Sequence, residues 1–357
     1  MRRLPSAAIL LSVLAATVVL AQQPPVFTPF GAIPVLDAYL DALRQQAGIP
    51  GMSAAVVRDG VVIWDKGYGF QDTSSRIRAT PDTPYLVGDL SGTIAAVMLL
   101  QCVEQRHLEL TEPIRSYGAE FPDGGATLRD LLSHTTPGAD EPFLYNPERY
   151  EQLTGLMEKC ESRSYRKSVA TLLDRMAMRD SVPGTDLWHS DTVLREGEFD
   201  ADDVARYRHV LDQMAVPYKV DSRSRADRFE LPPMPMSATG GLVSTVRDLA
   251  RLDAALDSTG ILRQETLDQA WNPVTTPQGI VTPMGLGWFV QSYRGERVVW
   301  HFGLIGNAYS SLVLKLPERK LTFILLANSD GLSAPFQLPA GNVTKSLFAA
   351  LFLRLVT

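Results

Sequence analysis

The fold is indicated most clearly by residues 50–69, which run PGMSAAVVRDGVVIWDKGYG. Two apolar runs rich in strand-forming residues, 52–57 and 61–68, flank the pair Asp59-Gly60. An Asp-Gly pair between two such runs is a strong signal for a tight β-hairpin. Residues 33–48, just before the hairpin, place apolar side chains at helical spacing. We therefore expect the folded chain to begin helix, strand, strand.

The C-terminal part of the chain returns to this strand pattern, whereas the middle is mostly helical. Strand-like runs are predicted at residues 285–293, 297–301, 309–316 and 321–327, followed by an apolar helix at 344–355. Helices are predicted at residues 93–106, 127–132, 149–159, 166–178, 200–215 and 245–257. This order predicts one sheet built from both chain ends, residues 22–80 and 240–357, with a helical domain, residues 81–239, inserted between them.

Composition excludes several classes of protein. The 357 residues are 45% hydrophobic and 21% charged, which is too apolar for a disordered chain. A formal net charge of −6 gives no electrostatic drive toward nucleic acid. Two cysteines cannot form a disulfide-rich scaffold or a thiolate-only metal site. The histidines show no metal-ligand spacing and no phosphate-binding loop is present, so we expect neither a metal nor a cofactor.

The N-terminus has the three parts of a secretory signal. A basic start, Met1-Arg2-Arg3, precedes the uncharged run AAILLSVLAATVVL at residues 7–20. We expect residues 1–21 to be a cleaved signal peptide, which places the protein in the periplasm or outside the cell and changes its formal net charge to −8. The alternative is an uncleaved anchor, although the run is shorter than the roughly 20 residues that span a membrane. In an oxidising compartment Cys102 and Cys160 could pair, or both could stay separate buried thiols.

A series of short motifs follows along the chain in a fixed order. It comprises Pro50-Gly51, Asp59-Gly60, Gly67-Tyr68-Gly69, Tyr85-Leu86-Val87-Gly88, Leu131-Leu132-Ser133-His134-Thr135-Thr136, Gly240-Gly241-Leu242, Gly285-Leu286-Gly287-Trp288 and Trp300-His301-Phe302-Gly303. Each motif is weak alone, but their order and spacing together resemble the serine β-lactamase-related family of class C β-lactamases, DD-peptidases and penicillin-binding-protein-like hydrolases. The resemblance covers nearly the whole chain after residue 21. It implies a β-lactamase/transpeptidase-like fold, an α/β part with an antiparallel sheet and an all-α insertion.

The resemblance also implies a reaction site, of which the first part is substituted here. The family places a nucleophilic serine at a helix start and a lysine one turn later, in the pattern Gly-Ser-x-x-Lys. That pattern aligns on residues 88–92, so Asp89 stands at the nucleophile position and Gly92 at the lysine position. We expect Asp89 to cap the helix that follows. The alternative is that its carboxylate is itself a nucleophile. Ser164-Tyr165-Arg166-Lys167 also matches Ser-x-x-Lys, but we expect Ser164 to be a helix cap.

The other parts of the family site are kept in outline. Tyr145 matches the tyrosine of the family's Tyr-x-Asn motif, with Pro147 in place of the asparagine; alternatively it is a packing aromatic. His301, Phe302 and Gly303 match a His-x-Gly motif that would contact a substrate carboxylate, and the bulk of Phe302 would narrow the cleft. His301 could equally be an ordinary strand histidine.

Three functions remain open on the sequence. The first is an exported, non-acylating relative that binds a small carboxylate or peptide-like ligand, or regulates, as a pseudoenzyme. We favour it because losing both members of a cooperating nucleophile and base removes most of the catalysis. The second is a hydrolase of β-lactam, ester or peptide substrates that uses a non-standard nucleophile. The third is a structural, partner-binding protein with a filled cleft. We expect no nucleic-acid partner and no membrane span after signal cleavage, and the oligomeric state stays open.

Overall fold

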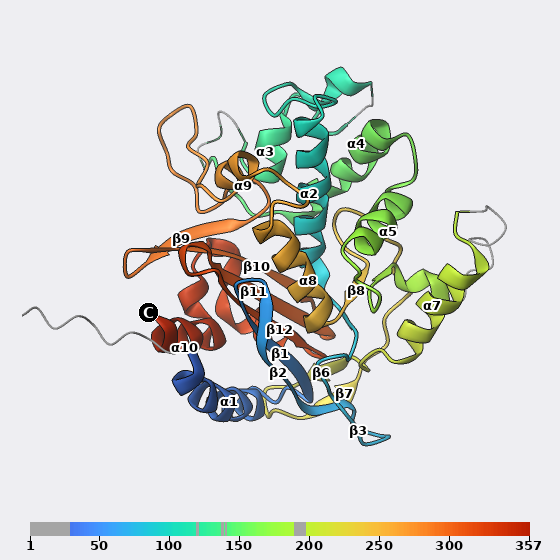
Figure 1. Cartoon of the computed structure of the whole chain (residues 1–357), viewed down its shortest axis with the longest axis vertical. Helices are drawn as coiled ribbons and strands as arrows, with labels where there is room; N and C mark the ends of the chain where they lie inside the picture. The colour runs from blue at the N-terminus through green and yellow to red at the C-terminus, as the bar shows by residue number, and fades with distance from the viewer. Residues whose placement is uncertain (1–28, 119–120, 137–138, 140, 189–197) are drawn as a thin grey trace, which may run out of the picture.

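A seven-stranded sheet forms the centre of the computed structural model, which describes residues 29–118, 121–136, 139, 141–188 and 198–357 (Figure 1). The strand order is β3-β2-β1-β12-β11-β10-β9, and every neighbouring pair is antiparallel. The strands are β1 (Gly51–Arg58), β2 (Val61–Asp72), β3 (Ile77–Arg78), β9 (Phe289–Tyr293), β10 (Glu296–Ile305), β11 (Tyr309–Leu316) and β12 (Leu321–Ala327). The predicted antiparallel sheet from both chain ends is therefore confirmed, while the predicted signal peptide lies outside the described residues.

The two chain ends meet at the middle of this sheet. Strand β1 pairs with β12 from Met52 opposite Ala327 to Arg58 opposite Leu321. The predicted hairpin joins β1 to β2, and both residues of its Asp59-Gly60 turn have positive φ, as a tight hairpin turn requires. All seven residues of β12 are buried, Thr322 among them, because helices cover both faces of this central strand.

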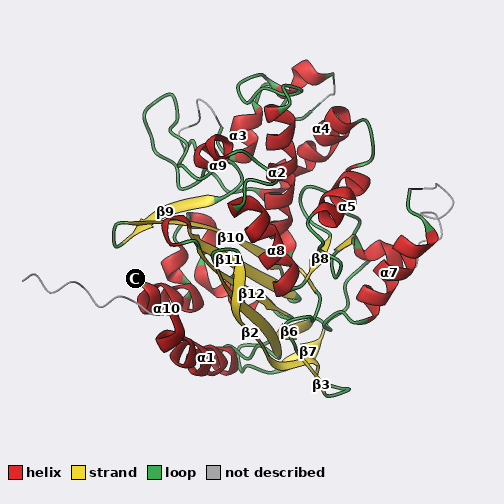
Figure 2. Ribbon diagram, in the orientation of Figure 1, coloured by secondary structure: helices red, strands yellow, loops and turns green. Residues whose placement is uncertain are grey.

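Helices cover both faces of the sheet (Figure 2). Helices α1 (Pro29–Gln46) and α10 (Leu347–Val356) pack on one face, where the ring of Phe352 stacks on Phe323 with centroids 4.5 Å apart. Helices α2 (Ser91–Glu104) and α8 (Val246–Asp257) pack on the other face. Side chains of β12 alternate between the two cores, so Leu325 belongs to the first and Ile324 to the second.

The helical part of the chain lies beside α2. It contains α3 (Leu128–Leu132), α4 (Glu151–Glu161), α5 (Tyr165–Arg175) and α7 (Ala201–Asp212). Helix α9 (Gln264–Ala270) follows α8 in the chain. The short strands β4 (Tyr85–Leu86), β8 (Leu242–Ser244) and β5 (Val182–Pro183) form a three-stranded sheet, and β6 (Tyr218–Val220) pairs with β7 (Ala226–Arg228). Ser164 caps α5 by accepting a hydrogen bond from Lys167 N, which confirms the capping interpretation of that Ser-x-x-Lys match. The domain boundaries at residues 80 and 240 stay a prediction.

A disulfide links two helices of the second core. Cys102 of α2 and Cys160 of α4 are bonded, with their Cα atoms 6.4 Å apart and 58 positions apart in the chain. The question that the sequence left open is thus resolved in favour of pairing. Within the described ranges, none of the helices combines the length and the apolar character needed to cross a membrane.

Candidate functional site

The candidate site lies where the backbone of β10 approaches the turn before α2. Ser311 Oγ donates a hydrogen bond to Val87 O at 2.7 Å, which ties this turn to the sheet. A side chain at Gly303 would overlap the Val87 carbonyl, so only glycine permits the close approach. The glycine of the His-x-Gly motif therefore serves backbone packing.

Asp89 lies in the 3₁₀ turn Gly88–Leu90 that leads into α2. Neither this turn nor α2 has a side-chain cap, so the expectation that Asp89 caps the helix is wrong. Burial raises the pKa of its carboxyl to about 7, and a hydrogen bond from the Leu304 N–H to the carboxylate opposes part of that rise. The carboxyl group turns toward β10 because that backbone N–H offers it a partner.

Gly92 lies one turn further along, against the ring of Tyr150. A Cβ atom at residue 92 would stand 2.9 Å and 3.0 Å from two carbon atoms of that ring. Tyr150 is held in place because its hydroxyl donates to Leu132 O at 2.8 Å and its ring stacks on His134 with centroids 4.7 Å apart. The space that the family's lysine side chain would enter is therefore already filled.

Tyr145 lies between His134 and the sheet. Asn146 N donates to His134 Nδ1 at 3.2 Å, and the ring centroids of Tyr145 and His134 are 4.6 Å apart. Burial, followed by the nearby charge of Asp89, raises the pKa of Tyr145 well above its usual value of 10.0. Tyr145 is therefore a neutral phenol that faces the Asp89 carboxyl.

The two histidines of the site are neutral. The ring centroids of His301 and Tyr145 lie 6.1 Å apart, and the His301 Nδ1 atom is 2.7 Å from Phe302 O, so Nδ1 carries the ring hydrogen. Burial lowers the pKa of His301 to about 4. Burial also lowers the pKa of His134 to about 3, with the neighbouring His301 and Arg149 contributing. His301 consequently offers no positive charge to a substrate carboxylate.

Phe302 lies on the opposite face of the sheet from the hydrophobic core around α2. It is 1% exposed, belongs to the core under α1 and α10, and its ring centroid lies 5.4 Å from that of Tyr145. Phe302 therefore packs behind Tyr145 and is absent from the walls of the candidate site.

The structure thus brings Asp89, Tyr145 and His301 together, as the sequence predicts, around almost no free space. The cavity they share has a volume of about 10 Å³, and its walls are formed by Asp89, His134, Tyr145, Pro147, Tyr150, Ala238, Thr239 and His301. A single water molecule needs roughly 10–15 Å³ by the same measure. The space beside Asp89 is therefore too small to hold more than about one water molecule.

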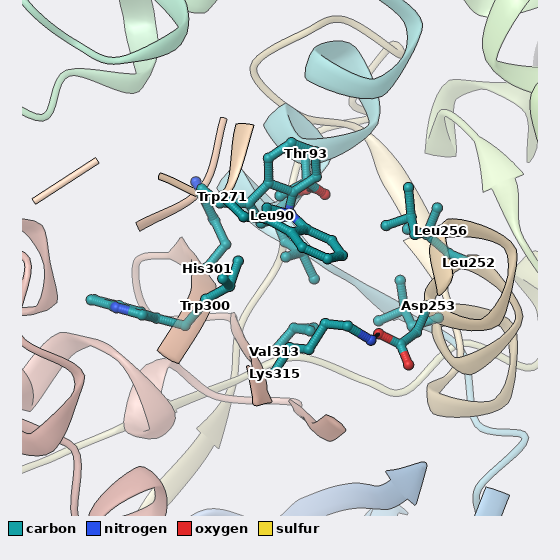
Figure 3. Close-up of a pocket in the computed structure, with 13 residues that line it drawn as sticks. Leu90, Thr93, Leu252, Asp253, Leu256, Trp271, Trp300, His301, Val313 and Lys315 are labelled. Atoms are coloured by element: carbon teal, nitrogen blue, oxygen red, sulfur yellow. Dashed lines mark hydrogen bonds and ion pairs between the residues drawn. The ribbon is translucent and has the colours of Figure 1, made fainter. Parts of the chain in front are cut away.

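A second small cavity lies on the other side of His301, between the sheet and α8 (Figure 3). Its volume is about 40 Å³. Figure 3 shows Lys315 and Asp253 pointing toward each other at its edge. The Lys315 ammonium lies 2.8 Å from both Asp253 Oδ1 and Asp257 Oδ1. Because all three groups are nearly enclosed, this cluster is a buried ion pair that holds α8 on β11.

Two contributors to the site were missed from the sequence. Tyr150 fills the lysine space, and the Leu304 N–H holds Asp89. A glycine in the first turn of an apolar helix does signal the close approach of another group. Nothing in the sequence identifies that group, and a backbone donor leaves no sequence signal.

The comparisons with known proteins agree with this architecture. A family profile described as Beta-lactamase matches residues 36–348. The chain belongs to the Beta-lactamase family. A homologue of penicillin-binding proteins from Pyrococcus abyssi, described as octameric, superposes with a TM-score of 0.68 at 22% identity, covering 90% of this chain and 77% of that one. At that identity the likeness shows the fold alone.

Two named proteins are similar in sequence to only part of this Beta-lactamase family member. It is 33% identical over 93 residues to the Bacillus subtilis (strain 168) protein named as penicillin-binding protein PbpX, covering 26% of this chain and 24% of that protein. It is 30% identical over 102 residues to the D-aminopeptidase of Brucella canis, covering 29% of this chain and 20% of that protein. The matched stretch thus spans about a quarter of the length of the Bacillus subtilis protein and about a fifth of the length of the D-aminopeptidase.

Proposed function

We propose that this protein is a non-acylating member of the Beta-lactamase family that acts by binding. The observation that carries the proposal is the ring of Tyr150 against Gly92, which fills the space of the family's lysine. The lysine is absent, and Asp89 stands where the family has its nucleophilic serine. The groups around Asp89 are the neutral phenol of Tyr145 and two neutral histidines. No cationic group of the described residues forms a wall of this cavity.

The filled cleft supports the same proposal. A covalent acyl-enzyme requires a substrate carbonyl within about 3–3.5 Å of the nucleophile. The cavity beside Asp89 is about 10 Å³, far below the 300–1,000 Å³ of typical small-molecule sites. Binding therefore takes place at another surface, as a pseudoenzyme with a filled cleft would require.

We also propose that the protein is exported. The signal-like residues 1–21 and the Cys102–Cys160 disulfide support a periplasmic or secreted location, because disulfides persist in oxidising compartments. A fusion of residues 1–30 to a reporter that is active only outside the cytoplasm tests export. An active reporter is expected, and an inactive reporter with the uncleaved segment attached would contradict it.

One observation favours the alternative, a hydrolase with a carboxylate nucleophile. The pKa of Asp89 is raised to about 7, and strongly shifted carboxyls gather at catalytic sites. The alternative requires the side chains around Asp89 to move apart, since the cavity has no room for a substrate.

Turnover measurements distinguish the two functions. The purified protein is assayed with a chromogenic cephalosporin and with p-nitrophenyl acetate, beside the matched variants Asp89→Asn and Tyr145→Phe. We expect rates equal to buffer for all three proteins. A rate above buffer that is lost in Asp89→Asn, with its fold intact by circular dichroism, would overturn the proposed function in favour of the alternative.

A further inference from the structure

Arg129 in α3 has a buried donor without a partner. Its Nε atom is enclosed by protein and makes no hydrogen bond. Across the part of the chain that the structure describes, its side chain forms neither an ion pair nor a hydrogen bond. Leaving a buried donor unpaired is costly, more so for a charged group, so such a group needs an explanation. Because the Nε atom itself is closed off by protein, a ligand would accept from the Nη atoms of the same guanidinium, which have no partner among the described residues.

Arg129 also lines a pocket of about 220 Å³. Its walls come from the start of α3, from the turn after α3 and from the loop before β9: Arg129, Asp130, Thr135, Thr136, Val274, Thr275, Thr276 and Pro277. This volume is several times the roughly 30 Å³ that one water molecule takes up in the liquid. The pocket can therefore admit a group of several non-hydrogen atoms, in contrast to the filled cavity at Asp89.

Two carboxylates that lie close to Arg129 in the chain have other partners. Asp130 Oδ2 accepts hydrogen bonds from Thr127 N at 2.9 Å and Thr127 Oγ1 at 2.6 Å, and its Oδ1 accepts from Thr135 Oγ1 at 3.2 Å. Asp123 pairs with Arg149 at 2.8 Å. Among the residues that the structure describes, no carboxylate pairs with Arg129, which leaves its charge available to a ligand.

The pocket walls also offer hydroxyl groups. Thr276 is 7% exposed, and its Oγ1 accepts from Ile280 N at 3.2 Å, which leaves the O–H hydrogen free to donate. Thr136 and Thr275 also line the pocket. A guanidinium fork and hydroxyl donors suit a planar carboxylate, which accepts two parallel hydrogen bonds from arginine. The Asp130 carboxylate on the same wall disfavours a doubly charged anion.

We propose that this pocket binds the carboxylate of a small ligand through the guanidinium of Arg129 and the hydroxyl of Thr276. The inference deepens the binding function proposed above and rests on it for its biological meaning. It uses residues separate from Asp89, Gly92 and Tyr145. A free organic acid and the C-terminus of a peptide carry the same chemistry, and the probes below separate them.

The test follows the Nε–H signal of Arg129 by ¹H–¹⁵N NMR in the full chain, with calorimetry for affinity. The probes are acetate, N-acetylglycylglycine and the C-terminal amide of that dipeptide. We expect the two free carboxylates to shift the signal and the amide to have no effect. A shift with acetate alone identifies a free acid as the ligand type, and a shift with the dipeptide alone identifies a peptide terminus.

Variants decide whether Arg129 is responsible. Arg129→Gln should weaken binding by about tenfold or more, since hydrogen bonds between charged groups are lost. Arg354→Gln, an exposed arginine on α10, is the matched control and should bind as the original protein does. Thr276→Val should also weaken binding, which keeps the test valid if Arg129→Gln does not fold. Absence of binding by both free carboxylates at millimolar concentration, or unchanged binding in Arg129→Gln, would overturn the inference. Substrate turnover that is lost in Asp89→Asn would refute the proposed function. It would leave the Arg129 NMR signal, and therefore the test of this inference, unchanged.

Discussion

The ring of Tyr150 occupies the space into which any side chain at Gly92 would extend, with its carbon atoms 2.9 Å and 3.0 Å from the position of a Cβ atom. This relationship ties the two substitutions of the site together. Glycine at residue 92 removes the family's lysine and also permits the tyrosine to pack. Restoring the lysine therefore requires a change in Tyr150 as well.

We predict that Asp89→Ser combined with Gly92→Lys does not restore acylation. The new lysine meets the Tyr150 ring, and overpacking of this kind typically costs about 1–3 kcal/mol. Labelling with a fluorescent penicillin, followed by a denaturing gel, should show no adduct. Adding Tyr150→Ala opens the space and provides the matched comparison. An adduct on the double variant would show that Tyr150 does not block the lysine position.

Asp89 makes stability depend on pH. Its folded-state pKa of about 7 lies above the ordinary 3.8, so between these values the folded state binds more protons than the unfolded state. The free energy of unfolding therefore falls as pH rises from about 4 to about 7. The raised pKa of Asp89 corresponds to a loss of about 4 kcal/mol in the free energy of unfolding over this pH range. This value is an upper bound, because Asp89 keeps partial solvent exposure.

Asp89→Asn should remove this pH dependence. We expect urea unfolding to show that the variant is stabilised relative to the original protein by more at pH 8 than at pH 4.5. The buried histidines His134 and His301 act in the opposite sense, because their lowered pKa values favour folding as pH rises toward 6.5. Both histidines remain in the variant, so the difference between the two proteins isolates Asp89. An equal effect at both pH values would contradict the raised pKa.

Lys315→Met should destabilise the protein strongly. Removing the ammonium leaves Asp253 and Asp257 buried without a cation, a change that costs about 3–5 kcal/mol. Lys345→Met, at an exposed lysine, should change the free energy of unfolding by less than about 0.5 kcal/mol. Replacing both aspartates by asparagine as well should recover part of the loss. A small effect of Lys315→Met alone would indicate that water reaches the two carboxylates.

The disulfide should be measurable both chemically and thermodynamically. Thiol titration of the unfolded protein should find no free thiol before reduction and two after it. The variant with Cys102→Ala and Cys160→Ala should lose about 4 kcal/mol of stability, by the chain-entropy estimate for residues 58 positions apart. Free thiols in protein purified from an oxidising compartment would contradict the pairing.

Much of the fold follows from the sequence alone. Helix and strand patterns placed the N-terminal hairpin and four C-terminal strands in one sheet, because apolar runs and an Asp-Gly turn have direct local causes. The order of the elements predicted one sheet from both chain ends, but the pairing of β1 with β12 was not predicted, because local patterns do not specify which strands lie side by side. The predicted ends of the helices differ by a few residues from those observed, since capping residues such as Thr127 and Thr245 lie just outside the helix.

The sequence predicts which residues form the candidate site but not the contacts that each of them makes. Motif alignment located Asp89, Tyr145 and His301, which the structure brings together. It gave Asp89 the wrong local role, because the preference of acidic residues for helix starts could not anticipate the Leu304 donor. It also placed Phe302 in the cleft, although strand alternation puts residues 301 and 302 on opposite faces of β10.

The central claim is that this member of the Beta-lactamase family cannot form an acyl-enzyme. The most direct test is incubation of the purified protein with a fluorescent penicillin, denaturation, and separation on a gel, with an active penicillin-binding protein as positive control. Our account predicts no labelled band for this protein while the control is labelled. A labelled band that survives denaturation and disappears in Asp89→Asn would contradict the account.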